Sequence, residues 1–200
     1  MLFQTTSVYW KELAAQLGGW NEYIAEYLTQ AFSFAAGPAI LVTTLSGLIA
    51  LLFYKYQQAC CGKASMGLSI LPLFLFWLFP SETIVPMLVL VWALAGTVVC
   101  QSMSNRNIRM LVGVLLVPLL YYVAVPAPYL YAVLLLLHEW MRADQRKPYL
   151  YTGVLLAWTF LLPLLVMRLW LVVPMREVWM GKYMYHLEYP VPQSFWLIFL

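Results

Sequence analysis

The side chains best suited to chemistry gather in two polar segments, one near each end of the chain. Glu22 and Glu26 stand four residues apart, so a helix would carry both carboxylates on one face. The second segment, with Arg168 just before it, mixes arginine, histidine and glutamate. Carboxylates and imidazoles serve as general acids and bases, and arginine binds phosphate through paired hydrogen bonds. The candidate catalytic residues are therefore Glu22, Glu26, His186 and Glu188, and the candidate substrate-binding residues are Arg168 and Arg176.

Each candidate also has a plainer explanation. Glu22 and Glu26 are interpreted first as a solvated polar face, and alternatively as an acidic cluster that binds a metal or a substrate. For Arg168 the plainer explanation is snorkelling to the membrane surface, and the alternative is a phosphate or an anionic headgroup. The aromatic and charged residues at 175–194 suit an interfacial helix, or a sugar or lipid-phosphate site. His138 and Glu139 are interpreted as an interfacial helix end, with a proton-handling pair as the alternative.

The three cysteines and the known motifs add no catalytic centre. Cys60 and Cys61 are adjacent, and Cys100 lies near the inner end of an apolar stretch. Adjacent cysteines rarely pair and the cytoplasm is reducing, so we expect free thiols. The sequence contains no CxxC, no His/Cys metal spacing, no GxxxxGK[ST] and no GxGxxG. We therefore expect no metal, no cofactor and no nucleotide hydrolysis.

The elements that must position these residues are apolar helices. Of the 200 residues, 64% are hydrophobic and 10% are charged, against about 25% charged in an ordinary soluble domain. Only a helix satisfies its own backbone hydrogen bonds inside a bilayer. The sequence predicts an all-α, polytopic transmembrane helical bundle with a transmembrane domain at 36–200. Its expected spans are 36–54, 66–79, 85–103, 110–125, 129–141 and 149–173, with a seventh opening at 195–200.

Basic residues gather in alternate breaks between these stretches. Seven of the eleven Lys and Arg lie there, namely Lys55, Lys63, Arg106, Arg109, Arg142, Arg146 and Lys147. Because such residues accumulate on the cytoplasmic side, that side is predicted to be the inner one. Residues 1–35 and 175–194 are then predicted to be periplasmic. One kinked span over 110–141 would invert the later topology and export three basic residues, so two short helices are preferred.

Residues 1–35 read as a pair of interfacial amphipathic helices broken at Gly18 and Gly19. The apolar positions of each half share one helical face, and Asn21 is predicted to cap the second helix. The segment has no signal peptide. Because the segment is nevertheless predicted to be periplasmic, we expect an upstream span before Met1. The apolar run at 195–200 ends abruptly, so we expect the chain to continue after Leu200.

Residues 3–39 also resemble a known family. The residues concerned are Phe3-Gln4, then the run Gly18-Gly19-Trp20-x-Glu22-Tyr23-x-x-x-Tyr27-Leu28-x-Gln30, and Gly37-x-Ala39 at the start of a span. This pattern resembles an uncharacterised multi-pass inner-membrane family of Bacteroidetes, in which a proline stands where this chain has Leu17. The resemblance implies a first span upstream and more helices downstream. It implies no activity and no catalytic residues.

Three functions remain open from the sequence. The first is an envelope anchoring or scaffold component of the bacterial inner membrane. The second is a glycosyltransferase-like enzyme that uses polyprenyl-phosphate sugars at an outward-facing site, a similarity that rests on architecture. The third, a transporter, ranks last because no Asp, Glu, Lys or Arg falls near the middle of a predicted span. We expect the lipid bilayer as partner, with a lipid-linked substrate or envelope proteins besides, and no nucleic acid.

Overall fold

The structure is a computed structural model that describes residues 7–78, 84–142, 149–169 and 179. Within these residues it is helical and contains no strand. In chain order the helices are α1 (Ser7–Ala14), α2 (Gly19–Thr29), the 3-10 helix η1 (Gln30–Ser33), α3 (Gly37–Cys61), α4 (Met66–Ser69), α5 (Leu71–Leu78), α6 (Val85–Gln101), α7 (Arg106–Val123), α8 (Ala127–Arg142) and α9 (Tyr149–Leu169). The expected seventh span at 195–200 lies outside the described residues.

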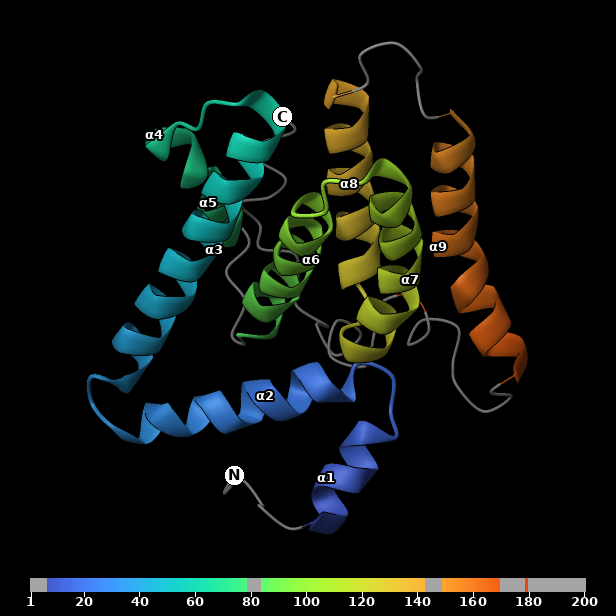
Figure 1. The fold of residues 1–200 in the computed structure, drawn as a ribbon. Coiled ribbons are helices and arrows are strands. Elements are labelled where there is room, and N and C mark those ends of the chain that lie inside the picture. Colours follow the sequence, from blue (N-terminus) through green and yellow to red (C-terminus); the bar gives the residue numbers. More distant parts are fainter. Residues whose placement is uncertain (1–6, 79–83, 143–148, 170–178, 180–200) are drawn as a thin grey trace, which may run out of the picture.

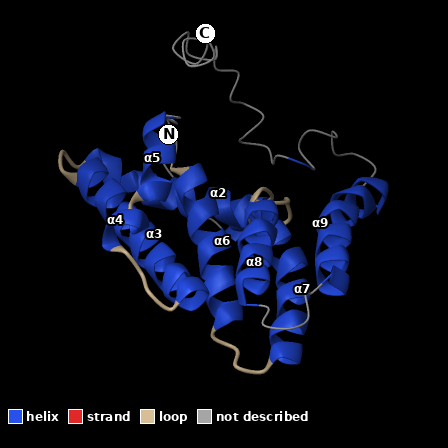
Figure 2. Cartoon of the chain, turned by 90° about the horizontal axis from the view of Figure 1, so that it is seen from above, coloured by secondary structure: helices blue, strands red, loops and turns tan. Residues whose placement is uncertain are grey.

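The long helices α3, α6, α7, α8 and α9 stand side by side; α3, α6 and α8 run in one direction, and α7 and α9 run in the other (Figures 1 and 2). Helix α6 packs against α3, α7 and α8, and α9 packs against α7 and α8. Helices α1 and α2 lie across one end of this bundle, which is the lower end in Figure 1. The opposite end holds the C-terminal ends of α3, α6 and α8 and the N-terminal ends of α7 and α9. We call the end covered by α1 and α2 the α2 end, and the opposite end the α4 end.

Local sequence signals explain where the long helices begin and end. Proline occupies the first turn of α3 and of α6, where its missing N–H costs nothing. Asn105 caps α7, because its side-chain oxygen accepts a hydrogen bond from the Asn107 backbone N–H at 3.0 Å. Gly62 ends α3 in the left-handed conformation, with φ at 68°, which glycine adopts at no steric cost. Since no breaker occurs earlier, α3 continues past residue 54, where the apolar stretch ends.

The stretch at 66–79 is two short helices rather than the one span predicted. Pro72 stands at the second position of α5 and has no backbone N–H. The Leu68 carbonyl therefore lacks its usual partner four residues on, and the ring of Pro72 crowds that carbonyl. The chain bridges the gap with tighter turns, in which Ile70 bonds to Gly67 and Leu73 bonds to Ile70.

The apolar stretch at 110–141 forms two packed helices, α7 and α8, and not one kinked helix. Ala124 has extended backbone and ends α7. The Pro126–Pro128 region then starts α8 in the opposite direction, as Figure 1 shows. Helix α7 begins four residues earlier than the apolar stretch, because Asn105 supplies a cap there. Its 18 residues amount to about 27 Å at 1.5 Å per residue.

Apolar side chains are abundant both inside the bundle and on its outside. The interior is formed around Ala93, Leu94, Tyr131, Leu135 and Leu155, each at most 1% exposed. Exposed leucines recur every four residues along α7, at Leu111, Leu115 and Leu119. By length and composition, α3, α7 and Tyr149–Arg168 could each cross a membrane, and Val85–Gln101 is a shorter apolar helix. The described part of the chain therefore holds three helices of membrane-spanning length.

The turn between α1 and α2 is fastened to the end of α7. The Gly18 N–H donates to the Tyr122 carbonyl at 3.0 Å, and the Tyr122 hydroxyl donates to the Ala14 carbonyl. Gly18 is left-handed, with φ at 75°. A Cβ on Gly19 would lie 1.8 Å from the Leu13 carbonyl oxygen. The two glycines thus permit a close turn that brings α2 under the bundle.

Candidate functional site

The two N-terminal glutamates both interact with the protein itself. Glu22 is 5% exposed and lies on the face of α2 that packs on the bundle, so its interpretation as a solvated residue is wrong. The amphipathic pattern predicted that the polar face of α2 meets solvent, whereas α2 packs on the bundle with a face that includes polar residues. Glu26 is half-buried and accepts a hydrogen bond from the Tyr9 hydroxyl of α1. Burial, and then this bond to a carboxylate, raise the pKa of Tyr9 to about 12.

Asn21 joins α2 to the bundle instead of capping the helix. The residue before α2 is Gly18, and no side chain bonds to the helix start there. The Asn21 side chain is 3% exposed, and its oxygen accepts a hydrogen bond from the Trp92 indole N–H of α6 at 3.1 Å. The predicted cap is therefore wrong. Its physical reason is that Asn21 falls inside the first turn, beyond the left-handed glycine.

Of the four candidates late in the chain, Arg168 alone is described. Arg176, His186 and Glu188 lie outside the described residues. Arg168 is exposed in the last turn of α9, at the α2 end of the bundle (Figure 1). Leu17, just before α2, and Val166, near the end of α9, pack against one apolar cluster. The structure thus places Arg168 and the N-terminal glutamates at the same end of the bundle. Their convergence on one cavity stays a prediction.

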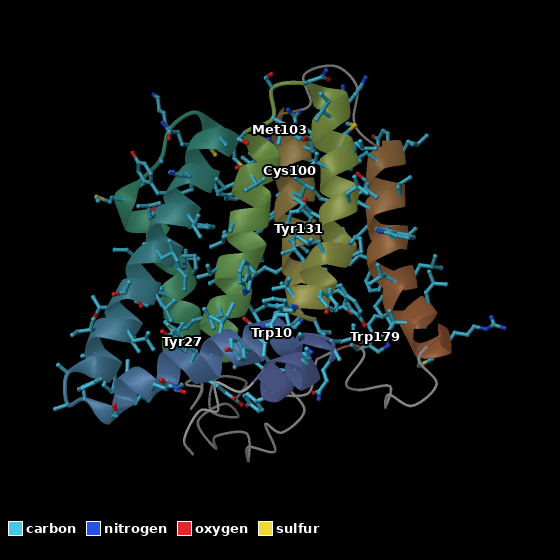
Figure 3. All side chains as sticks on the ribbon, turned by 60° about the horizontal axis from the view of Figure 1, so that its bottom comes forward. Trp10, Tyr27, Cys100, Met103, Tyr131 and Trp179 are labelled. Carbon is cyan, nitrogen blue, oxygen red and sulfur yellow. The ribbon has the colours of Figure 1, made fainter. Side chains whose placement is uncertain are left out.

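Trp179 is the one described residue of the segment at 175–194. Its ring stacks on Tyr129 with centroids 6.1 Å apart and at 11°, and it also contacts Phe160. Figure 3 shows Trp179 at the same end as Trp10 and Tyr27, opposite Cys100 and Met103. This residue therefore belongs to the α2 end.

The α4 end holds a buried ion pair that the sequence did not reveal. The Arg109 Nε of α7 lies 2.6 Å from the Glu139 Oε1 of α8, and the two side chains are 6% and 5% exposed. Arg109 also donates to the Met103 carbonyl at 3.2 Å. In the sequence both charges stood beside helix ends and looked interfacial. The signal available in the sequence was that the α8 stretch carries a single acidic residue, Glu139, while the neighbouring α7 stretch carries Arg106 and Arg109.

Further polar groups surround this pair inside the bundle. The Cys100 thiol of α6 donates to the Arg109 carbonyl at 3.2 Å, and the Tyr131 hydroxyl of α8 donates to the Gly113 carbonyl at 3.2 Å. Tyr151 of α9 is 7% exposed, and its hydroxyl has no hydrogen-bond partner. A Cβ on Gly113 would lie 2.2 Å from that hydroxyl oxygen. Gly113 therefore makes room for the Tyr151 hydroxyl. Figure 3 shows Cys100 and Tyr131 inside the bundle.

His138 and Glu139 are buried, at 0% and 4% exposed, so their interpretation as an interfacial helix end is wrong. Their helix ends at Arg142, but Cys60 of α3 lies against His138 and Arg109 of α7 lies against Glu139. The His138 Nδ1 lies 3.4 Å from the Cys60 sulfur of α3. The Gln101 Nε2 of α6 lies 3.9 Å from the same sulfur. We call Cys60, Gln101 and His138 the thiol cluster.

The described cysteines are all free thiols: Cys60 is half-buried, Cys61 exposed and Cys100 buried. Among the described residues, no three His, Cys, Asp or Glu side chains form a set that could hold a metal ion. The reactive groups at the α4 end are therefore a thiol beside an imidazole, and a buried ion pair lies near them.

Comparison with known proteins identifies a family without assigned activity. The chain belongs to the family of unknown function DUF6057, whose model matches residues 1–200. Neither the curated proteins nor the solved structures contain a significant match.

Proposed function

Because the family has no assigned activity, we propose from the residues themselves that the chain is a multi-pass component of the bacterial inner membrane, acting as an envelope anchoring or scaffold module. The carrying observation is the run of apolar side chains facing outward along the long helices. These include Ile40, Leu48 and Leu51 on α3, Leu111, Leu115 and Leu119 on α7, Leu130, Val133 and Leu137 on α8, and Phe160, Leu161 and Leu164 on α9. Water disfavours such a surface, whereas hydrocarbon accepts it.

In this proposal the α4 end faces the cytoplasm. Lys55, Lys63 and Arg106 are exposed at or near that end, and the positive-inside rule assigns it to the cytoplasmic side. The proposal keeps six membrane-embedded stretches, of which the α4–α5 stretch and α8 are shorter than the roughly 30 Å hydrocarbon core. Residues 1–35 and 175–194 then lie on the periplasmic side, where the Trp179 contacts with Tyr129 and Phe160 accord with the second range.

Helices α1 and α2 serve as an interfacial platform on the outer side. Trp10 and Trp20 meet edge to face with centroids 5.3 Å apart. Tyr27 is 57% exposed and Phe34 72% exposed, and aromatic rings favour the headgroup zone. The bond from Tyr9 to Glu26 joins α1 to α2. The polar residues of the platform are thus used to hold it together, which favours a structural role and suits envelope proteins as partners.

One observation favours the alternative, an enzyme with an outward-facing site that uses polyprenyl-phosphate sugars. Burying a carboxylate is costly, yet α2 turns Glu22 toward the bundle at 5% exposure. A catalytic acid whose protonation is set by its surroundings would occupy such a position. Arg168 at the same end would then hold a lipid-linked phosphate.

A complementation experiment separates the two functions. A strain deleted for the gene is scored for growth in the presence of detergent, with the protein resupplied as wild type, Glu22→Gln or Glu26→Gln. Each change keeps the side chain's shape and removes its charge. The scaffold proposal expects both variants to restore growth at wild-type membrane levels. Failure of Glu22→Gln at a normal membrane level, with Glu26→Gln active, would replace the scaffold proposal with the enzyme.

A further inference from the structure

The thiol cluster combines three groups from three helices that the scaffold role does not use. Cys60 comes from the last turn of α3, Gln101 from the end of α6 and His138 from the last turns of α8. The sulfur lies 3.4 Å from the His138 Nδ1 and 3.9 Å from the Gln101 Nε2. Cys60 is half-buried, while His138 is fully buried. A buried imidazole thus lies beside a thiol on a half-buried residue.

A thiol with an imidazole within hydrogen-bond reach is the arrangement of an activated nucleophile. With the ring proton on Nε2, the Nδ1 of His138 accepts the thiol proton. The amide N–H of Gln101 lies close enough to donate to an oxygen on a carbon bound to that sulfur. Such a donor stabilises the oxyanion of acyl transfer. The Gln101 Oε1 atom is buried and has no hydrogen-bond partner. Because a buried polar atom without a partner lowers the stability of the folded protein, this amide is retained at a cost in stability.

We propose that Cys60 is an acyl-accepting nucleophile, with His138 as its base and Gln101 as its oxyanion donor, and that its substrate is an acyl thioester. The Cys60 proton moves to His138 as the sulfur attacks the thioester carbonyl carbon. The oxyanion formed accepts a hydrogen bond from Gln101. The intermediate collapses, the donor's carbon–sulfur bond breaks, and the leaving thiolate takes the proton from His138. The products are an acylated Cys60 and a free thiol, with no change in oxidation state.

The surroundings of the cluster suit an anionic thioester. Lys55, Lys63 and Arg106 are exposed at or near this end of the bundle. An acyl thioester carried on a phosphorylated thiol is negatively charged, so basic groups raise its local concentration. Phe53, which is half-buried and lies seven residues before Cys60 on the same face of α3, offers an apolar side chain to the acyl chain.

The chain supplies its own matched control, because Cys61 is adjacent and exposed but takes no part in the cluster. The purified protein in detergent is incubated with an alkyne-tagged long-chain acyl thioester of coenzyme A, and the acylated residue is mapped by mass spectrometry. A hydroxylamine-sensitive label is expected on Cys60. Cys60→Ser should abolish it and Cys61→Ser should leave it unchanged. Equal labelling of Cys61, or no label, would overturn the proposal.

Two further variants separate chemistry from structure. His138→Gln should slow acylation of Cys60, and its alkylation by iodoacetamide, by at least about 10-fold, since a positioned base contributes that much or more. Gln101→Met should slow acylation by about 10-fold or more but leave alkylation unchanged, because displacement at a saturated carbon forms no oxyanion. If His138→Gln does not fold, the Gln101→Met result decides alone. Equal effects of Gln101→Met on both reactions, or none on either, would refute the assigned roles.

Discussion

The buried pair of Arg109 and Glu139 offers the clearest single perturbation. The two atoms lie 2.6 Å apart with side chains 6% and 5% exposed. Glu139→Gln keeps the shape of the side chain and one acceptor oxygen but removes the negative charge. Arg109 then stays charged among apolar residues, with the Met103 carbonyl as its remaining charge-stabilising acceptor. We expect the free energy of unfolding to fall by about 3 kcal/mol, the lower part of the range for breaking a buried pair.

The measurement is reversible unfolding in mixed micelles, with SDS as denaturant and helix content followed by circular dichroism. Lys63→Met serves as control, because it removes an exposed charge near the same end and should change stability by less than about 0.5 kcal/mol. The double variant Arg109→Met with Glu139→Gln removes both charges. It should recover most of the loss, since apolar replacements of a buried pair are often neutral.

The coupling free energy between the two positions should therefore exceed about 1 kcal/mol. A loss below about 1 kcal/mol for Glu139→Gln would match an exposed pair. That result, or additive effects in the double variant, would show that the pair is not buried in the folded protein and refute the reasoning.

Three further changes test other contacts. Gly19→Ala places a Cβ 1.8 Å from a backbone oxygen and should lower the free energy of unfolding by about 1–3 kcal/mol. In the control Gly47→Ala the Cβ meets nothing within 4 Å, so the free energy of unfolding should rise by about 0.5–1 kcal/mol. Equal effects of the two changes would refute the close turn. Asn21→Leu leaves the Trp92 N–H without its acceptor and should cost about 1–3 kcal/mol, a cost that must shrink in a Trp92→Phe background. If Arg168 only snorkels, Arg168→Lys and Arg168→Leu should both keep wild-type membrane levels and growth. A loss of growth with both variants at normal membrane levels would indicate a bidentate phosphate contact, because the point charge of Lys does not replace the guanidinium fork.

Hydropathy located the helical stretches because each runs uninterrupted between polar or proline-containing breaks. It did less well on their ends. α3 continues to Cys61 because Gly62, not Lys55, stops it. The stretch at 66–79 divides at Ile70 because a single proline removes a backbone donor inside an otherwise apolar run. A glycine or a proline is visible in the sequence, but whether it ends a helix depends on the side chains that pack around it.

The polar clusters could not be predicted because their members are far apart in the chain. Arg109 and Glu139 are 30 residues apart, and Cys60 and His138 are 78 apart. A charge beside a helix end looks interfacial until a neighbouring helix covers it. Glu22 was misinterpreted for the same reason, since an amphipathic pattern does not tell which face meets the bundle. Tertiary packing, and not periodicity, decides the environment of such residues.

The orientation of the bundle in the membrane is the central claim, and cysteine accessibility tests it most directly. In a background without the native cysteines, Tyr27→Cys at the α2 end and Lys63→Cys near the α4 end are probed in intact cells, in separate proteins, with a maleimide that crosses the outer but not the inner membrane. Both positions are exposed in the structure. We expect labelling of Tyr27→Cys in intact cells, and of Lys63→Cys only after the inner membrane is permeabilised. Labelling of Lys63→Cys in intact cells with Tyr27→Cys protected would contradict it.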